Sequence, residues 1–264
     1  MNKTVGCIGL GNMGRAILDG LITSNAGYAY AGYDINQSAA VELKERITVC
    51  STAAQCSEKS DILILAVKPG VMKSVLPEIK TRPETVYISI AAGMTISTIE
   101  NYLGSSSKII RVMPNTPSLI GHGMSVLAPG NSVTDSDLEE AEALFRTIGK
   151  TLILPEPLLN AVTGVSGCGP AYVYTCIQAM ADGGVKMGLS RTDAVLLAAQ
   201  TLLGAAHMVM ETGQDPITLR NMVTSPGGST IAAIHKLESH GFSGALMDAV
   251  EEATHVTERL GKNK

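Results

Sequence analysis

A spaced run of glycines follows the first strand-like segment of the chain, residues 5–8. Gly9, Gly11 and Gly14 form the pattern GxGxxG, and the helical run 16–22 comes directly after them. In this arrangement the first glycine makes a tight turn, and the second lets main-chain amides approach a pyrophosphate. The third permits close packing of the helix on the strand. The spacing therefore predicts binding of a dinucleotide, with its phosphates at the N-terminus of the helix.

Asp34 stands twenty residues after Gly14, at the end of a second strand-like segment, 28–33. A carboxylate at this point accepts hydrogen bonds from the adenosine ribose and repels a 2′-phosphate, which favours NADH over NADPH. No arginine stands next to Asp34 to bind that phosphate. A second interpretation stays open, in which Asp34 only caps the following helix or begins a turn. The residues alone therefore leave the coenzyme preference open.

Three further loops follow predicted strands, and ligands of an open parallel sheet bind beyond the carboxyl ends of its strands. One loop carries a lysine and a proline, one carries two alanines, and one carries an asparagine between two prolines. A solvated surface lysine and a simple turn remain alternatives for the first and the third. The coenzyme-binding residues that we predict are Ile8, Gly9, Leu10, Gly11, Asn12, Met13, Gly14, Asp34, Ala66, Val67, Lys68, Pro69, Ala91, Ala92 and Asn115.

A second glycine-containing segment, SPGGST, opens a predicted helix at residues 225–230. The exposed amides and the positive dipole end of such a helix hold a small carboxylate. An ordinary helix cap explains one hydroxyl there, but not two glycines as well. We therefore predict that the substrate-binding residues are Ser225, Gly227, Gly228, Ser229 and Thr230, with the Thr230 hydroxyl in a catalytic role.

These loops require a scaffold of strands and helices. Six strand-like runs alternate with helical segments, at 5–8, 28–33, 62–67, 85–89, 108–113 and 151–154. Strands that are apolar on both faces and separated by helices predict a mostly parallel, doubly wound α/β sheet of the Rossmann type. Two prolines near residue 155 break this rhythm. We expect a dinucleotide-binding domain over 1–157 and a helical dimerisation and substrate-binding domain over 158–264.

Helical signals alone continue beyond residue 160, and we expect helices at 170–188, 191–212, 215–222, 229–240 and 243–260. Residues 169–210 carry only four charged side chains, and 194–210 carry none. Helices that are apolar all round are not the wet surface of a small monomer, so we expect burial against another subunit. The uncharged stretch is shorter than the roughly 20 residues of a membrane span, so we expect a protein environment and no membrane.

Composition excludes several other classes. The net charge of −4 shows no basic bias, so a nucleic-acid partner is not expected. Five cysteines without CxxC spacing fit a reducing cytoplasm, and no signal peptide is expected. The five histidines show no ligand spacing with acids or cysteines, so we expect no metal.

Seven motifs occur together in this chain, namely GLGNMG, AVKP, AAG, RVMPNTP, VTGVSGCGPAY, ADGGVKMGL and SPGGST. The combination resembles the pyrroline-5-carboxylate reductases, which reduce a cyclic imine to L-proline. The resemblance covers essentially the whole chain. It implies a Rossmann-like domain, a homodimer through the C-terminal helices, and in some members a ring of five dimers. It also implies NADPH as the usual coenzyme, and a hydrogen bond from the Thr230 hydroxyl to the ring nitrogen.

Three positions depart from the pattern of that family. Cys168 stands where members often have serine, and Asn160 where many have aspartate. Asp34 stands where members commonly have a small hydroxyl residue, which bears on the choice between NADH and NADPH.

Two alternative functions are compatible with a dinucleotide site. The β-hydroxyacid dehydrogenases use a lysine four residues after a glycine like Gly169 and an asparagine three further on, where this chain has Val173 and Cys176. Without that lysine, alcohol oxidation is not expected. A nucleotide-sensing protein without catalysis would keep GLGNMG but would have no need of SPGGST.

Overall fold

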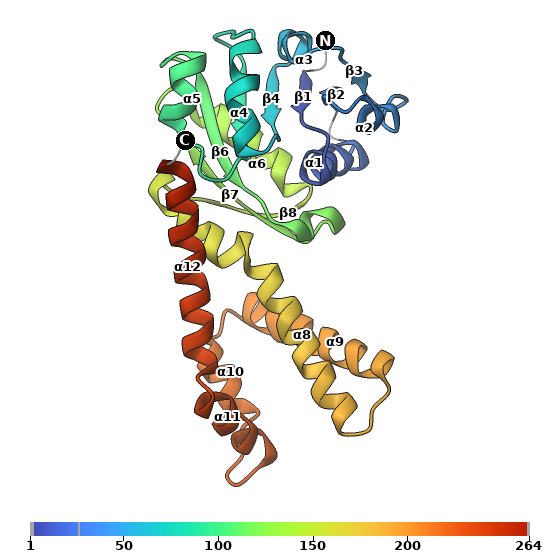
Figure 1. Ribbon diagram of the computed structural model, residues 1–264, viewed down its shortest axis with the longest axis vertical. Coiled ribbons are helices and arrows are strands. Elements are labelled where there is room, and N and C mark those ends of the chain that lie inside the picture. Colours follow the sequence, from blue (N-terminus) through green and yellow to red (C-terminus); the bar gives the residue numbers. More distant parts are fainter. Residues whose placement is uncertain (1–2, 26, 263–264) are drawn as a thin grey trace. The chain divides into compact units, whose positions relative to one another are not determined.

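The computed structural model describes residues 3–25 and 27–262 of the 264-residue chain. They form two compact units, and Figure 1 labels most of their helices and strands. The first unit contains the residues up to 167 together with those from 252 onward, and the second contains residues 168–251.

An eight-stranded sheet in the order β3-β2-β1-β4-β5-β6-β7-β8 forms the centre of the first unit. Its strands are β1 (Thr4–Ile8), β2 (Ala29–Tyr33), β3 (Thr48–Val49), β4 (Ile62–Leu65), β5 (Val86–Ser89), β6 (Lys108–Met113), β7 (Gly123–Pro129) and β8 (Gly149–Ile153). Neighbours from β3 to β6 pair in parallel, whereas β7 is antiparallel to β6 and parallel to β8. The predicted doubly wound α/β sheet is confirmed, with β3 and β7 as additional strands.

Helices cover both faces of this sheet. One face packs against Ile17 and Leu21 of α1 and Phe145 of α6, and the other against Met72 of α4 and Ile99 of α5. The helical elements of this part of the chain are α1 (Asn12–Thr23), α2 (Gln37–Val41), α3 (Ala53–Lys59), α4 (Pro69–Val75), η1 (Leu76–Glu78), α5 (Ile96–Leu103), η2 (Thr116–Ile120) and α6 (Asp135–Arg146). Because both faces are buried, only the strand ends and their loops are available to a ligand.

The first unit extends past the predicted boundary at residue 157. The elements η3 (Glu156–Leu158), α7 (Leu159–Val162) and the π-helical turn η4 (Thr163–Gly167) belong to it, and Leu159 is buried among Met113, Val126 and Ala128. The end of the last helix also packs here, because a Cβ on Gly93 would lie 3.2 Å from the main-chain nitrogen of Gly261. The sequence therefore becomes helical before the chain leaves the first unit.

The second unit contains the remaining helices, and all five helices predicted beyond residue 160 are present. They are α8 (Gly169–Lys186), α9 (Arg191–Thr212), α10 (Pro216–Met222), α11 (Ser229–Ser239) and α12 (Phe242–Lys262), of which α12 continues into the first unit. Ser190 caps α9 by accepting from the N–H of Asp193, and Asp215 caps α10 by accepting from that of Ile217. A left-handed Gly213, with φ of +64°, ends α9.

The surface of α9 stays largely uncovered within one chain. Leu196 and Leu197 are 67% and 54% exposed, and only Ala194 and Ala198 of this helix are buried. Among the described residues α9 alone is long and apolar enough to cross a membrane, by length and composition. The expectation that this helix is buried in protein is therefore not met by the chain itself, and its burial requires contact with something outside it.

Candidate functional site

The glycine loop joins β1 to α1. Gly9 has a φ of +97°, and its N–H donates to the Tyr33 carbonyl oxygen over 2.8 Å. A Cβ on Gly9 would lie 2.7 Å from the Ala66 carbonyl oxygen, and one on Gly14 would overlap the Gly9 carbonyl oxygen. Nothing lies within 4 Å of a Cβ built on Gly11. Gly9 and Gly14 thus let main chains meet, while Gly11 faces open space.

The N-terminus of α1 has free main-chain donors. Its N-cap residue is Gly11, which has no side chain to accept from them, and its first turn has no acidic side chain. The first hydrogen bond of the helix runs from the Arg15 N–H to the Gly11 carbonyl oxygen over 2.9 Å. The preceding N–H groups, of Asn12, Met13 and Gly14, therefore have no partner within the helix, which makes this end suitable for an anion.

Asp34 links the glycine loop to the turn after β2. Its Oδ2 accepts from the N–H of Leu10 over 2.7 Å, and its Oδ1 accepts from the N–H of Asn36 over 2.8 Å. Asn36, and not Asp34, caps α2 by accepting from the N–H of Ser38. Asp34 thus begins a turn, as one interpretation of the sequence has it. A carboxylate has about four acceptor positions, so positions remain for ribose hydroxyls.

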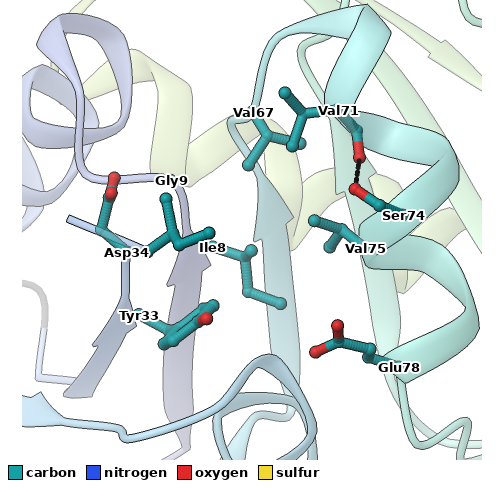
Figure 2. Close-up of a pocket in the computed structure, with 10 residues that line it drawn as sticks. Ile8, Gly9, Tyr33, Asp34, Val67, Val71, Ser74, Val75 and Glu78 are labelled. Carbon is teal, nitrogen blue, oxygen red and sulfur yellow. Dashed lines mark hydrogen bonds between the residues drawn. The ribbon is translucent and has the colours of Figure 1, made fainter. Parts of the chain in front are cut away.

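A cavity of about 110 Å³ lies beside Asp34 and Gly9. Figure 2 shows Asp34 and Glu78 on opposite sides of it, with aliphatic side chains between them. The lining residues are Ile8, Gly9, Tyr33, Asp34, Ile35, Val67, Val71, Ser74, Val75 and Glu78. This lining has two carboxylates and neither lysine nor arginine. An apolar slot with acceptors at its sides suits a heterocycle and a neutral ribose better than a phosphate monoester.

The loops after β4 and β5 lie at the same edge of the sheet. The Ala66 N–H donates to the Ile8 carbonyl oxygen over 2.8 Å, and Pro69 occupies the first position of α4. Lys68 is exposed, and it takes part in none of the ion pairs formed among the described residues. Ala91 is buried and Ala92 is half-buried. These loops therefore present mainly backbone and small side chains beside the glycine loop.

Asn115, after β6, connects three segments through its carboxamide. Its Nδ2 donates to the Ser166 carbonyl oxygen over 3.1 Å, and its Oδ1 accepts from the N–H of Met124 over 2.9 Å. The side chain thereby ties its own loop to β7 and to η4. This bracing role was not predicted from the sequence, and it leaves the second amide hydrogen for a ligand.

The SPGGST segment lies in the second unit, at the start of α11. Gly227 has a φ of +68°, and the N–H of Gly228 donates to the Ser225 carbonyl oxygen over 3.0 Å. Gly228 is the N-cap of α11, where no side chain accepts from the first amides, and a Cβ on it would overlap the Ser225 hydroxyl. Ser229 is exposed and Thr230 is half-buried. Free amides and neighbouring hydroxyls are thus gathered at one helix N-terminus.

The thiols beneath the glycine loop are structural. Cys7 donates through Sγ to the Gly9 carbonyl oxygen over 3.4 Å, and Cys56 donates to that of Cys7 over 3.8 Å. Burial raises the pKa of both thiols, that of Cys56 to about 12. They stay protonated and do not act as nucleophiles. Among the described residues, no group of three or more histidine, cysteine or acidic side chains could hold a metal ion.

The structure places the predicted residues in two groups. Residues 8–14, Asp34, 66–69, Ala91, Ala92 and Asn115 lie at the carboxyl ends of strands in the first unit, and residues 225–230 lie in the second unit. Sequence reasoning missed six lining residues of the cavity, namely Tyr33, Ile35, Val71, Ser74, Val75 and Glu78. No motif marks them, because they are ordinary residues of β2, of the turn after it and of the α4–η1 region.

Comparison with known proteins covers the whole chain. Residues 156–260 match the family described as pyrroline-5-carboxylate reductase dimerisation, and residues 4–93 match that described as NADP oxidoreductase coenzyme F420-dependent. The chain is 41% identical to the pyrroline-5-carboxylate reductase of Escherichia coli K12, over 100% of both chains. It is 42% identical to that of Methanosarcina acetivorans, over 99% of both.

Solved structures give the same result. The crystal structure of Plasmodium falciparum pyrroline carboxylate reductase with NADP bound matches with a TM-score of 0.89 and 33% identity, over 98% of each chain. A pyrroline-5-carboxylate reductase structure from Coxiella burnetii matches with a TM-score of 0.91 and 32% identity, over 98% of this chain and 99% of that one. With about 40% identity to curated relatives over the full length, the chain belongs to the pyrroline-5-carboxylate reductase family.

Proposed function

We propose that this protein reduces 1-pyrroline-5-carboxylate to L-proline by hydride transfer from a nicotinamide coenzyme. The observation that carries the proposal is the uncapped N-terminus of α11 in SPGGST, with its free amides and its hydroxyls at Ser225, Ser229 and Thr230. An alcohol dehydrogenase of similar architecture would need a lysine where this chain has Val173. The family membership supports the same reaction.

The first unit supplies the coenzyme site in this proposal. The main-chain N–H groups at the start of α1 bind the pyrophosphate, and the cavity beside Asp34 takes the adenosine. The loops with Lys68, Ala91, Ala92 and Asn115 line the nicotinamide half. The bound coenzyme supplies the hydride. The dinucleotide-binding role is assigned to residues 1–157, and the dimerisation and substrate-binding roles to 158–264.

The substrate site in this proposal uses main-chain amides and hydroxyls. The free amides of Ser229 and Thr230 bind the carboxylate of the imine, while the Gly228 N–H stays bonded to the Ser225 carbonyl oxygen. The Thr230 hydroxyl bonds the ring nitrogen. Within the described part of the chain that hydroxyl has no hydrogen-bond partner, so it is available for this role. The imine takes its proton from solvent to form the iminium, and hydride addition to the ring carbon then gives the neutral amine, so no charged general acid is required.

We also propose that NADH serves as coenzyme at least as well as NADPH. Asp34 presents a carboxylate at the ribose position, and the adjoining cavity lining has no cationic side chain to pair with a 2′-phosphate. One relative has been solved with NADP bound, so this preference is a property of these particular residues and not of the family.

The assembly proposed is a homodimer through the C-terminal helices. The exposed apolar side chains of α9 and the match of residues 156–260 to a dimerisation family support it. A second copy, and not a membrane, then covers α9; a ring of five dimers is the larger alternative. A cytoplasmic location is proposed with it, since all five cysteines are free thiols.

Steady-state assays with purified protein test the reaction and the coenzyme together. NADH and NADPH oxidation is expected only in the presence of 1-pyrroline-5-carboxylate, with kcat/KM for NADH equal to or above that for NADPH. Coenzyme binding without imine-dependent oxidation would instead support a nucleotide sensor and contradict the proposed reaction.

Asp34→Ser is expected to shift coenzyme selection toward NADPH. Removing the carboxylate removes its repulsion of the 2′-phosphate, so the ratio of kcat/KM for NADPH to that for NADH should rise about tenfold, equivalent to about 1.4 kcal/mol. The same substitution at Asp135, an exposed residue at the start of α6, is the control. An unchanged ratio in Asp34→Ser would show that the carboxylate does not contact the ribose.

Thr230→Ala is expected to lower kcat about a hundredfold, because the hydrogen bond that orients the reacting ring nitrogen is lost. The melting temperature should stay within about 2 °C of wild type, because the hydroxyl holds no other part of the described structure together. Thr230→Ser keeps the hydroxyl and is the matched control. Near-normal turnover in Thr230→Ala contradicts the assignment.

Gly11→Ala and Gly14→Ala are expected to fail in different ways. A Cβ on Gly11 meets no protein atom, so this variant should fold normally but bind NADH at least tenfold more weakly, by obstructing the pyrophosphate. A Cβ on Gly14 overlaps the Gly9 carbonyl oxygen, so this variant should lose thermal stability. Melting curves and NADH titrations separate the two, and unchanged NADH affinity in Gly11→Ala would place the pyrophosphate elsewhere.

A further inference from the structure

An ion pair between a buried arginine and a half-buried glutamate lies near the carboxyl ends of the strands. Arg111 stands inside β6, and its Nη1 lies 2.7 Å from Oε1 of Glu156 in η3. The two side chains are 5% and 27% exposed. The residues before and after Arg111 are buried and apolar, and it lies in register with Ser89 of β5 and Ala128 of β7.

Stability alone is a poor explanation for this pair. Removing two charges from water costs about as much as their attraction returns, and well-packed apolar residues of similar volume often stabilise a fold equally well or better. Ile109 and Met113, which share the face of the strand with Arg111, are such apolar residues. The role of the pair therefore follows from the specific contacts that its two side chains make.

Glu156 has a second contact through the same oxygen. Its Oε1 also accepts from the main-chain N–H of Ile96 over 2.7 Å. Ile96 begins α5 and comes three residues after Gly93, the last residue of the Ala91-Ala92-Gly93 loop. Arg111 stands four residues before Asn115. One carboxylate oxygen thus joins the segments that carry the loops after β5 and β6.

The backbone around Glu156 is suited to hold that carboxylate in place. Pro155 and Pro157 flank it, and each proline ring fixes its own φ near −65°. Ten residues further along, the Ser166 carbonyl oxygen accepts from Asn115. Segment 156–167 is therefore attached at one end to β6 and to the start of α5, and at the other end to the loop after β6. These elements carry the two loops that are proposed to line the nicotinamide half of the site.

We propose that Glu156 is a positioning residue for hydride transfer, acting through Arg111 and the Ile96 N–H on the loops after β5 and β6. This rests on the proposed function. It orders the nicotinamide half of the coenzyme site and leaves the adenosine half, around Asp34, unaffected. Loss of the pair therefore lowers kcat and the affinity for the intact coenzyme, but not the affinity for ADP-ribose, which lacks the nicotinamide ring.

The test compares Arg111→Met/Glu156→Leu with wild type. Removing both charges leaves neither the buried Arg111 nor the half-buried Glu156 as an unpaired ion, so the melting temperature should stay near that of wild type. The kcat should fall about tenfold to a hundredfold, because a misplacement of about 1 Å in a reacting pair has effects of that size. The dissociation constant of ADP-ribose should not change, and that of NADH should rise at least threefold.

Two single variants refine the comparison. Glu156→Gln keeps an oxygen that accepts from Ile96 and Arg111, so kcat should stay within about threefold of wild type. Glu156→Asp keeps the charge but shortens the side chain by one methylene, so kcat should fall with unchanged ADP-ribose affinity. Lys108→Met is the control, because it removes the ion pair to Asp137 at the other end of the same strand.

Wild-type kcat in the double variant, or in Glu156→Asp if the double variant does not fold, would overturn the proposal and leave the pair a purely structural role. An equal loss of NADH and ADP-ribose affinity would overturn it as well. Absence of imine-dependent oxidation in wild type would instead refute the proposed function, and the ratio of NADH to ADP-ribose affinity would still report on the positioning role.

Discussion

The proposed coenzyme site, at the carboxyl ends of the strands, depends on close approach of main chain to main chain. A Cβ on Gly9 or Gly14 would collide with backbone, so β1 and α1 meet through glycines, whereas a Cβ on Gly11 would face open space. The same principle recurs at α11, where Gly228 stands against the Ser225 hydroxyl. Both helices then begin without a side-chain cap, which leaves N–H groups free for anions.

Charged side chains have few roles in such a site. The Asp34 carboxylate holds the glycine loop through the Leu10 N–H and faces the cavity, and Glu156 bonds a main-chain amide and Arg111. Each organises backbone in addition to any contact with a ligand. Two features therefore account for the low charged fraction of the chain, 17%. One is a site that uses main-chain groups, and the other is α9, whose apolar surface stays uncovered within one chain.

Local patterns predicted the sheet and the helices well, and long-range contacts poorly. Helix α9 begins after Ser190 and ends at Gly213, as expected, because capping residues act on main-chain groups close to them in the sequence. Strand β7 was missed, since GMSVLAP begins with glycine and ends with proline and its direction is opposite to that of β6. The place of Glu78 in the cavity lining could not be predicted from residue spacing. The same holds for the contacts of Glu156 with residues 45 and 60 positions away, because only the folded sheet brings these residues together.

The most direct measurement is a crystal structure of the protein with NADH. We expect pyrophosphate oxygens within about 3.2 Å of main-chain nitrogens at residues 12–14, with the adenosine ribose hydroxyls on the Asp34 carboxylate. A pyrophosphate held by side chains away from the glycine loop, or a ribose that does not contact Asp34, would contradict it.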